Sequence, residues 1–93
     1  MNVAVCDDEK KTREQIVAMI KEQYSDAKIS CFSTAEEMIA GRGFFDICFL
    51  DIEMGSVSGI ELAKRIRKEQ GNSGKRSIII FVTAFREYME DAF

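Results

Sequence analysis

The hexapeptide DICFLD, residues 46–51, decides the fold of this sequence. Its four middle residues are apolar, and because successive side chains of a strand point to opposite faces, both faces of this strand must be buried. Such a strand lies in the middle of a parallel sheet that is covered by helices on each side. The segment ends in a carboxylate, Asp51, which places a charged group at the carboxyl end of a central strand.

Three other short segments are also predicted to be strands. They are rich in β-branched and apolar residues and are bounded by polar or glycine-containing stretches. They comprise residues 2–6, 27–32 and 77–82. With residues 46–51 they give four buried or half-buried strands in 93 residues.

Amphipathic helices are predicted between these strands. The first covers residues 10–23, where apolar side chains recur at helical spacing; these are Ile16, Val17, Met19 and Ile20. The second follows the capping-box pattern of Ser33 and Glu36 and is stopped by the glycines of residues 41–43.

The third helix opens at a second capping box, Ser58 with Glu61, and ends at residues 72–74. Its predicted buried stripe consists of Ile60, Leu62, Ala63 and Ile66. A further helix is expected to begin around Arg86. Strands and helices therefore alternate along the whole chain, which is typical of an α/β fold with a doubly wound parallel sheet.

The composition excludes several kinds of chemistry. The chain has no His, so mechanisms that pair Ser or Cys with His, or bind a metal through His, are excluded within it. The three cysteines, Cys6, Cys31 and Cys48, are odd in number, widely spaced and set in apolar runs, so we expect them to be buried thiols of a reducing compartment. A net charge of −3 argues against a nucleic-acid surface in this segment. Without an apolar run of bilayer length or a basic leader, a cytoplasmic protein with no membrane contact is expected.

Three carboxylates stand at strand ends. Asp7 and Asp8 follow the strand of residues 2–6, and Asp51 ends the strand of residues 46–51. In a flavodoxin-like order, 2-1-3-4, these two strands are neighbours at roughly 4.8 Å, and ligands bind where the strand order reverses. We therefore expect the three side chains to converge in one cleft.

Crowded carboxylates need a cation to stay ionised together. Oxygen ligands without His or thiolate favour a hard ion, and few side-chain ligands suit Mg²⁺. A carboxylate beside such an ion can also attack phosphorus to give an aspartyl phosphate. Thr83 and Ala84 follow the strand of residues 77–82, where the hydroxyl of Thr83 could hydrogen-bond a phosphoryl oxygen and Ala84 leaves space.

Simpler interpretations exist for each residue alone. A single Asp after a strand is often a helix cap or turn residue, and so is Thr83 at a strand end. Glu53 is most simply a solvated loop residue, although its backbone carbonyl could reach a metal. The pair Phe44 and Phe45 is expected to pack in the core or at a helix end rather than to hold a ligand. The combination of strand-end carboxylates is what favours a site.

At these residues the sequence resembles the receiver domain of bacterial two-component response regulators. The resemblance rests on VCDDE at residues 5–9, on DIEM at residues 51–54 with Gly59 eight positions after Asp51, and on VTA at residues 82–84. It covers residues 1–93, and residues 83–93 look most like receivers joined to a LytTR-type DNA-binding domain.

The resemblance assigns roles to named residues. Asp51 would be the phosphoacceptor, and Asp7, Asp8, Asp51 and the backbone carbonyl of Glu53 would hold Mg²⁺. Thr83 would be the switch hydroxyl, and Ala84 the small residue that admits the phosphoryl donor. The donor would be a sensor histidine kinase, and DNA would be bound only through an output domain outside this chain.

The sequence departs from the family pattern in two places. Gly55 stands where receivers usually carry Pro, so the loop after Asp51 is expected to be more mobile. The family also places an essential Lys at the end of a fifth strand, and the sequence ends before that strand and the last helix. We therefore expect a receiver domain over residues 1–93 that is cut short, with residues 78–82 at an open sheet edge through which two copies could pair.

Three functions are compatible with this sequence. The first is a phosphorylation switch that is not an enzyme in the metabolic sense. The second is a pseudo-receiver that binds or dimerises without being phosphorylated, an alternative that the missing Lys keeps open. The third is a haloacid-dehalogenase-like aspartyl phosphatase, which is disfavoured because that family wants a second Asp where Glu53 stands.

Overall fold

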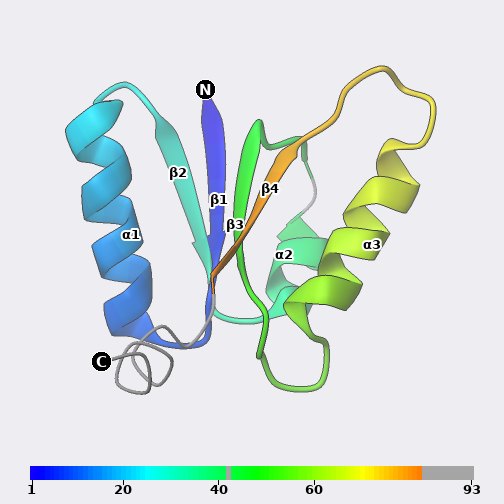
Figure 1. Ribbon diagram of the computed structural model, residues 1–93, viewed down its shortest axis with the longest axis horizontal. Helices are drawn as coiled ribbons and strands as arrows, with labels where there is room; N and C mark the ends of the chain where they lie inside the picture. Colours follow the sequence, from blue (N-terminus) through cyan, green and yellow to red (C-terminus); the bar gives the residue numbers. More distant parts are fainter. Residues whose placement is uncertain (42, 83–93) are drawn as a thin grey trace, which may run out of the picture.

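The computed structural model describes residues 1–41 and 43–82 and shows a three-layer α/β fold (Figure 1). The four strands are β1 (Asn2–Cys6), β2 (Lys28–Phe32), β3 (Ile47–Asp51) and β4 (Ile78–Val82). They form one parallel sheet in the order β2-β1-β3-β4, which confirms the predicted order.

In the described part of the chain, three helices cover the two faces of the sheet. They are α1 (Lys10–Gln23), α2 (Ala35–Gly41) and α3 (Gly59–Gln70). Helix α1 lies on one face, and α2 and α3 lie together on the other (Figure 1). The helix expected around Arg86 lies outside the described residues.

The core is divided by the sheet into two clusters. Val3 and Val5 of β1 pack toward Ile16 and Ile20 of α1. The alternate residues of the same strand, with β3, α2 and α3, form the larger cluster, whose buried members include Ala4, Cys6, Leu50, Met38 and Leu62. Because β1 has buried side chains on both faces, it is held as a central strand.

Side-chain caps begin two of the three described helices, α2 and α3. The Glu61 N–H donates to the Oγ of Ser58 at 3.2 Å, which confirms the predicted cap of α3. At α2 the cap differs from the prediction by one residue, since the Glu37 N–H donates to the Oγ1 of Thr34 at 3.1 Å. The carboxylate of Glu37 then accepts from the N–H of Ser33, so Thr34 and Glu37 replace the predicted pair Ser33 and Glu36.

Three predictions of burial were wrong. Met19 is 54% exposed and Ile60 is 45% exposed, because each lies one position outside the stripe that faces the sheet. Cys31 is exposed on β2, whereas Cys6 and Cys48 are buried as expected. Strand β2 borders the sheet in the described residues, so its outer surface is left to solvent.

The pair Phe44 and Phe45 divides between core and surface. The ring of Phe45 packs edge-on against Phe32 at a centroid distance of 6.0 Å and lies against the larger core cluster. The ring of Phe44 is 38% exposed, with the Lys75 ammonium 5.9 Å from its centroid. Packing was therefore the correct expectation for Phe45 and only partly correct for Phe44.

Within residues 1–41 and 43–82, every helix is too short or too polar to cross a bilayer.

Candidate functional site

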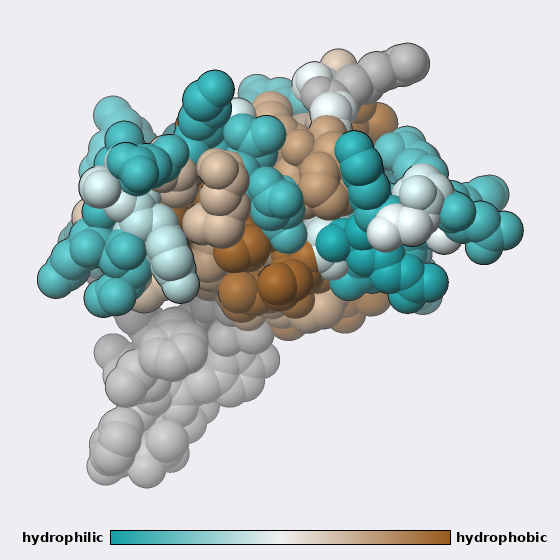
Figure 2. All heavy atoms as spheres, turned by 90° about the horizontal axis from the view of Figure 1, so that it is seen from above, coloured by the Kyte–Doolittle hydropathy of each residue, from teal (hydrophilic) through white to brown (hydrophobic). Residues whose placement is uncertain are grey.

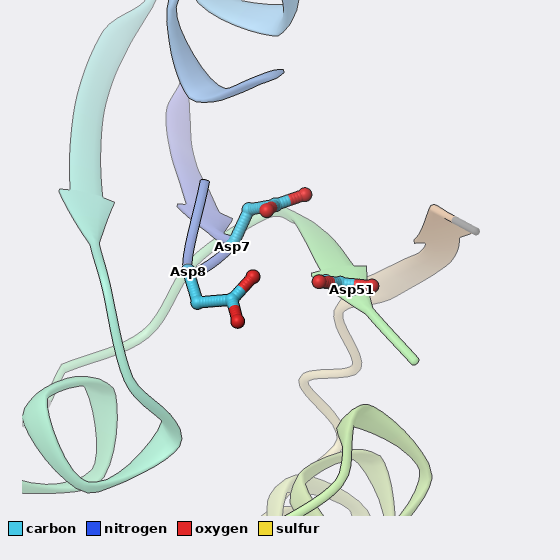
Figure 3. A group of neighbouring side chains, drawn as sticks. All are labelled: Asp7, Asp8 and Asp51. Carbon is cyan, nitrogen blue, oxygen red and sulfur yellow. The ribbon is translucent and has the colours of Figure 1, made fainter. Parts of the chain in front are cut away.

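Three carboxylates meet at the carboxyl ends of β1 and β3. Residue Cys6 of β1 pairs with Leu50 of β3, so the residues that follow them, Asp7 and Asp51, emerge side by side. One oxygen from each of Asp7, Asp8 and Asp51 lies within 4.8 Å of the others. Figure 3 shows the three side chains gathered at this end of the sheet. The predicted convergence of these carboxylates is confirmed.

The three groups differ in exposure, and their crowding affects their protonation. Asp7 is only 4% exposed, Asp51 is half-buried and Asp8 is exposed. Burial, followed by the charge of Asp7, raises the pKa of Asp51 to about 6. Burial also raises the pKa of Asp7. Burial is therefore the main cause of both shifts, and the neighbouring carboxylates add to it.

Backbone N–H groups fix two of the carboxylates. The Glu9 N–H donates to the Oδ1 of Asp7 at 2.9 Å, and the Glu53 N–H donates to the Oδ1 of Asp51 at 3.2 Å. Each is a local turn in which a side chain is bonded two residues further on. Each bond uses the Oδ1 atom and so fixes the orientation of its carboxylate.

Gly59 lets α3 start directly against the backbone of Asp51. Its N–H donates to the carbonyl of Ile52 at 2.9 Å. A Cβ at this position would lie 2.0 Å from the carbonyl oxygen of Asp51, a distance that no side chain can adopt. The Gly59 of the sequence motif is therefore required by this close approach.

The loop after Asp51 is anchored by a buried methionine. Met54 is 4% exposed, and its sulfur lies 3.5 Å from the thiol of Cys6. The next residue, Gly55, has a φ of +45°, which proline cannot adopt because its ring holds φ near about −65°. Gly55 therefore gives the loop a turn that is different from the one a proline would give.

Arg13 is a contact of the site that sequence analysis missed. This side chain on the first turns of α1 donates from Nη1 to the backbone carbonyl of Asp7 at 2.7 Å. The only sequence signal was an Arg six residues after Asp7, one turn inside an amphipathic helix. That position is compatible with a solvated charge as much as with a contact.

The other predicted site residues divide into two groups. Glu53 is exposed and its N–H contacts Asp51, while Thr83 and Ala84 lie outside the described residues. Lys10 and Lys11 lie on α1, as expected.

The carboxylate cluster suits a hard divalent cation. Its donors are all oxygen atoms, they come from two adjacent strands, and at least one of them is strongly buried. A cation would also remove the repulsion that raises the pKa of Asp51. A parallel 2-1-3-4 sheet with this cluster at its switch point is the arrangement expected from the resemblance to the receiver class of signalling domains.

Comparison with known proteins places the chain in one family of that class. The family model of the response regulator receiver domain matches residues 3–93, and the chain belongs to this family. It is similar to the sensory transduction protein LytT of Oceanobacillus iheyensis, with 28% identity over 95 residues. It is also similar to the transcriptional regulatory protein BtsR of Escherichia coli, with 35% identity over 96 residues. Each alignment covers all of this chain and 38% of the relative.

Solved structures agree with this assignment. The response regulator TrrA from Thermotoga maritima, in complex with Mg²⁺ and BeF, is 34% identical, with a TM-score of 0.75 over 97% of this chain and 75% of that one. A complex of the histidine kinase ThkA with TrrA gives 34% identity and a TM-score of 0.73, covering 90% of this chain and 69% of that one. The chain is thus a receiver domain of a two-component system, related to the LytT and BtsR regulators.

Proposed function

We propose that Asp51 accepts a phosphoryl group and that the chain works as a phosphorylation switch. The observation that carries this proposal is the meeting of Asp7, Asp8 and Asp51 within 4.8 Å at the carboxyl ends of β1 and β3. Family membership supports it, because the chain belongs to the response regulator receiver domains.

The carboxylates of Asp7, Asp8 and Asp51 and the backbone carbonyl of Glu53 would hold Mg²⁺. When bound, this ion neutralises charge that develops on the phosphoryl oxygens. The TrrA relative, which is in complex with Mg²⁺ and BeF, supports this assignment. The donor set found here agrees with it, since it contains only oxygen ligands.

The chemical step uses the carboxylate of Asp51. Its Oδ1 accepts the Glu53 N–H, which orients the carboxylate to attack phosphorus. A new O–P bond forms, and the P–N bond of a phosphohistidine breaks with its electron pair staying on the departing imidazole. The chain has no His, so the donor is a partner, a sensor histidine kinase. The complex of ThkA with TrrA supports this kind of partner.

Two residues beyond the described part complete the proposal. The hydroxyl of Thr83 would bond the phosphoryl group and report its presence, and Ala84 would leave room for the donor. Phosphorylation would then change what the domain binds, without net turnover of a substrate.

The role of the whole protein is proposed from its longer relatives. The chain spans 38% of the length of LytT and BtsR, and BtsR is described as a transcriptional regulator. We propose that residues 1–93 belong to a receiver joined to an output domain that binds DNA.

The test is phosphorylation by a small donor. The full-length protein is incubated with acetyl phosphate and MgCl₂, and its intact mass is measured at once. The wild type is expected to gain one phosphoryl group that is lost on mild alkaline treatment. Asp51→Asn is expected to gain none, and neither is the wild type in EDTA.

The outcomes separate the competing functions. An adduct that persists in Asp51→Asn would move the phosphoacceptor elsewhere. No adduct in a wild type that binds Mg²⁺ would make the domain a phosphorylation-independent binding module. Sustained hydrolysis of phosphate esters would identify an aspartyl phosphatase instead.

A further inference from the structure

We propose that Arg13 is a positioning residue for the metal site, because it holds the short loop that carries Asp7 and Asp8. The inference rests on the proposed function, since it concerns the affinity of the same carboxylates for Mg²⁺. It adds a residue on α1 that is outside the carboxylate cluster itself.

The contact is short and charged. Nη1 of Arg13 donates to the carbonyl oxygen of Asp7 at 2.7 Å, at the short end of the range for a charged N–H donor. The Arg13 side chain is half-buried, so water competes with this bond less than it would at an open surface. An Arg placed this way is more than a solvated charge on a helix.

The carbonyl of Asp7 is an effective point to hold. It belongs to the planar peptide unit whose N–H is that of Asp8, so fixing it fixes where the chain enters Asp8. The rest of Asp7 is already held, since its N–H donates to the carbonyl of Phe32 at 3.0 Å and its Oδ1 accepts from Glu9. Arg13 supplies the third restraint, the one directed at Asp8.

Within the described residues, the other restraint from the start of α1 is a backbone bond, in which the Arg13 N–H donates to the carbonyl of Glu9 at 3.1 Å. Glu9, at the N-cap position, makes no side-chain cap bond. The first turn has no acidic residue and begins with Lys10 and Lys11, which are unfavourable near a helix N-terminus. Only residues 7–9 connect β1 with α1, so an anchor from Arg13 controls most of the connection.

The charge of Arg13 and its position predict opposite effects of its removal on Mg²⁺ affinity. A positive charge beside the carboxylates repels a cation, so if Arg13 acted only through its charge, removing it would tighten Mg²⁺ binding. If Arg13 acts by holding the loop, its removal lets Asp8 move away and weakens binding. The sign of the change therefore distinguishes the two roles.

The experiment measures Mg²⁺ affinity by titrating MgCl₂ into ¹⁵N-labelled protein and following amide shifts. Arg13→Gln is expected to weaken binding roughly three- to tenfold, less than the full value of a charged hydrogen bond because the substitution also removes a positive charge that repels the cation. Arg13→Lys keeps the charge and can still donate to one carbonyl, so its affinity should lie between those of Arg13→Gln and the wild type. Lys11→Gln, which removes an exposed cation from the same helix turn, is the matched control and should bind at least as tightly as the wild type.

A second readout needs no metal. The amide of Asp8 shares its peptide plane with the carbonyl that Arg13 holds, so its ¹⁵N shift should move in Arg13→Gln and Arg13→Lys but not in Lys11→Gln. Unchanged or tighter Mg²⁺ binding by Arg13→Gln, with the wild type binding normally, would overturn the inference and leave the proposed function intact. A loss of Mg²⁺ affinity in Lys11→Gln as large as that in Arg13→Gln would also overturn the inference and leave the proposed function intact. A wild type that does not bind Mg²⁺ would overturn both.

Discussion

Burial and the neighbouring acids make the Asp51 carboxyl harder to ionise. In the folded chain its pKa is raised to about 6, above the ordinary value of 3.8, first by burial and then by Asp7. Between these two values the folded state binds more protons than the unfolded state, so the free energy of unfolding falls as pH rises through this window. The site is therefore built at some expense to stability at neutral pH.

This cost predicts that Asp51→Asn stabilises the protein in the absence of divalent cations. At pH 7.5 the variant is expected to gain on the order of 1 kcal/mol in free energy of unfolding, a value reduced from the full pKa shift because Asp51 is partly solvated. Below about pH 3 the gain should disappear, since Asp51 is then protonated in both states. Urea unfolding at the two pH values measures it.

The control for this experiment is Asp26→Asn, at an exposed turn residue. It should change stability little at either pH. Adding MgCl₂ should stabilise the wild type more than Asp51→Asn, because a bound cation removes the repulsion. A gain in Asp51→Asn that is the same at both pH values would contradict the electrostatic origin.

A second residue-scale prediction concerns Gly59. In Gly59→Ala the new Cβ would meet the Asp51 carbonyl at 2.0 Å, so the start of α3 must move. We expect a loss of roughly 2–4 kcal/mol in stability and a weaker reaction of Asp51 with acetyl phosphate. Ile60→Ala, at the exposed next residue, should cost far less. Equal losses in the two variants, measured by urea unfolding, would argue against the close approach.

At this scale the sequence allowed the carboxylates to be predicted but not their support. Asp7, Asp8 and Asp51 could be placed together because parallel strands bring their carboxyl ends to one edge of a sheet. The contact of Arg13 with Asp7 could not be predicted, since a long side chain that reaches a backbone carbonyl leaves no periodic pattern. Exposure of Met19 and Ile60 was missed because helical spacing marks a stripe only to within one position.

At the scale of elements, the N-cap of α3 connects local sequence to the site. Ser58 accepts from the N–H of Glu61 at 3.2 Å and begins the helix that rests on the Asp51 backbone. Ser58→Ala is expected to cost about 1 kcal/mol in free energy of unfolding. Ser56→Ala, two residues earlier, removes only the exposed bond to Glu36 and should stay within about 0.5 kcal/mol of the wild type. A Ser58→Ala protein as stable as Ser56→Ala would show that the cap contributes little.

The helices and strands were largely predictable from the sequence, whereas the burial of their side chains was less so. The order of the seven described elements and the central place of β3 were predicted from the alternation of apolar strands and amphipathic helices. Cys31 was predicted to be buried because β2 reads like the other strands. Its exposure comes from the position of β2 at a border of the sheet, which the predicted strand order already implied but the composition of β2 alone does not show.

At the scale of the whole molecule, the described sheet has an apolar strand at its other border. Within residues 1–41 and 43–82, β4 has one hydrogen-bonded strand neighbour, β3. Three of its side chains are exposed, Ile78 by 60%, Phe81 by 44% and Ile80 by 40%. Figure 2, seen from above, shows hydrophobic surface between two hydrophilic flanks. An open and apolar strand edge is a template for pairing with another chain.

This edge predicts that a polypeptide of residues 1–93 associates with itself through β4. Sedimentation velocity should show a shift from monomer to dimer as the concentration rises. Ile78→Lys should weaken the association at least about tenfold, since burying an isoleucine side chain contributes about 1.5–3 kcal/mol and each copy would lose that burial. The ladder bond from the Ile78 N–H to the carbonyl of Asp46 uses the backbone and is kept in the variant. Met19→Lys, at a similarly exposed apolar residue of α1, is the matched control and should leave the dimer unchanged. A monomer at all concentrations, or equal weakening by the two variants, would show that β4 is not the contact.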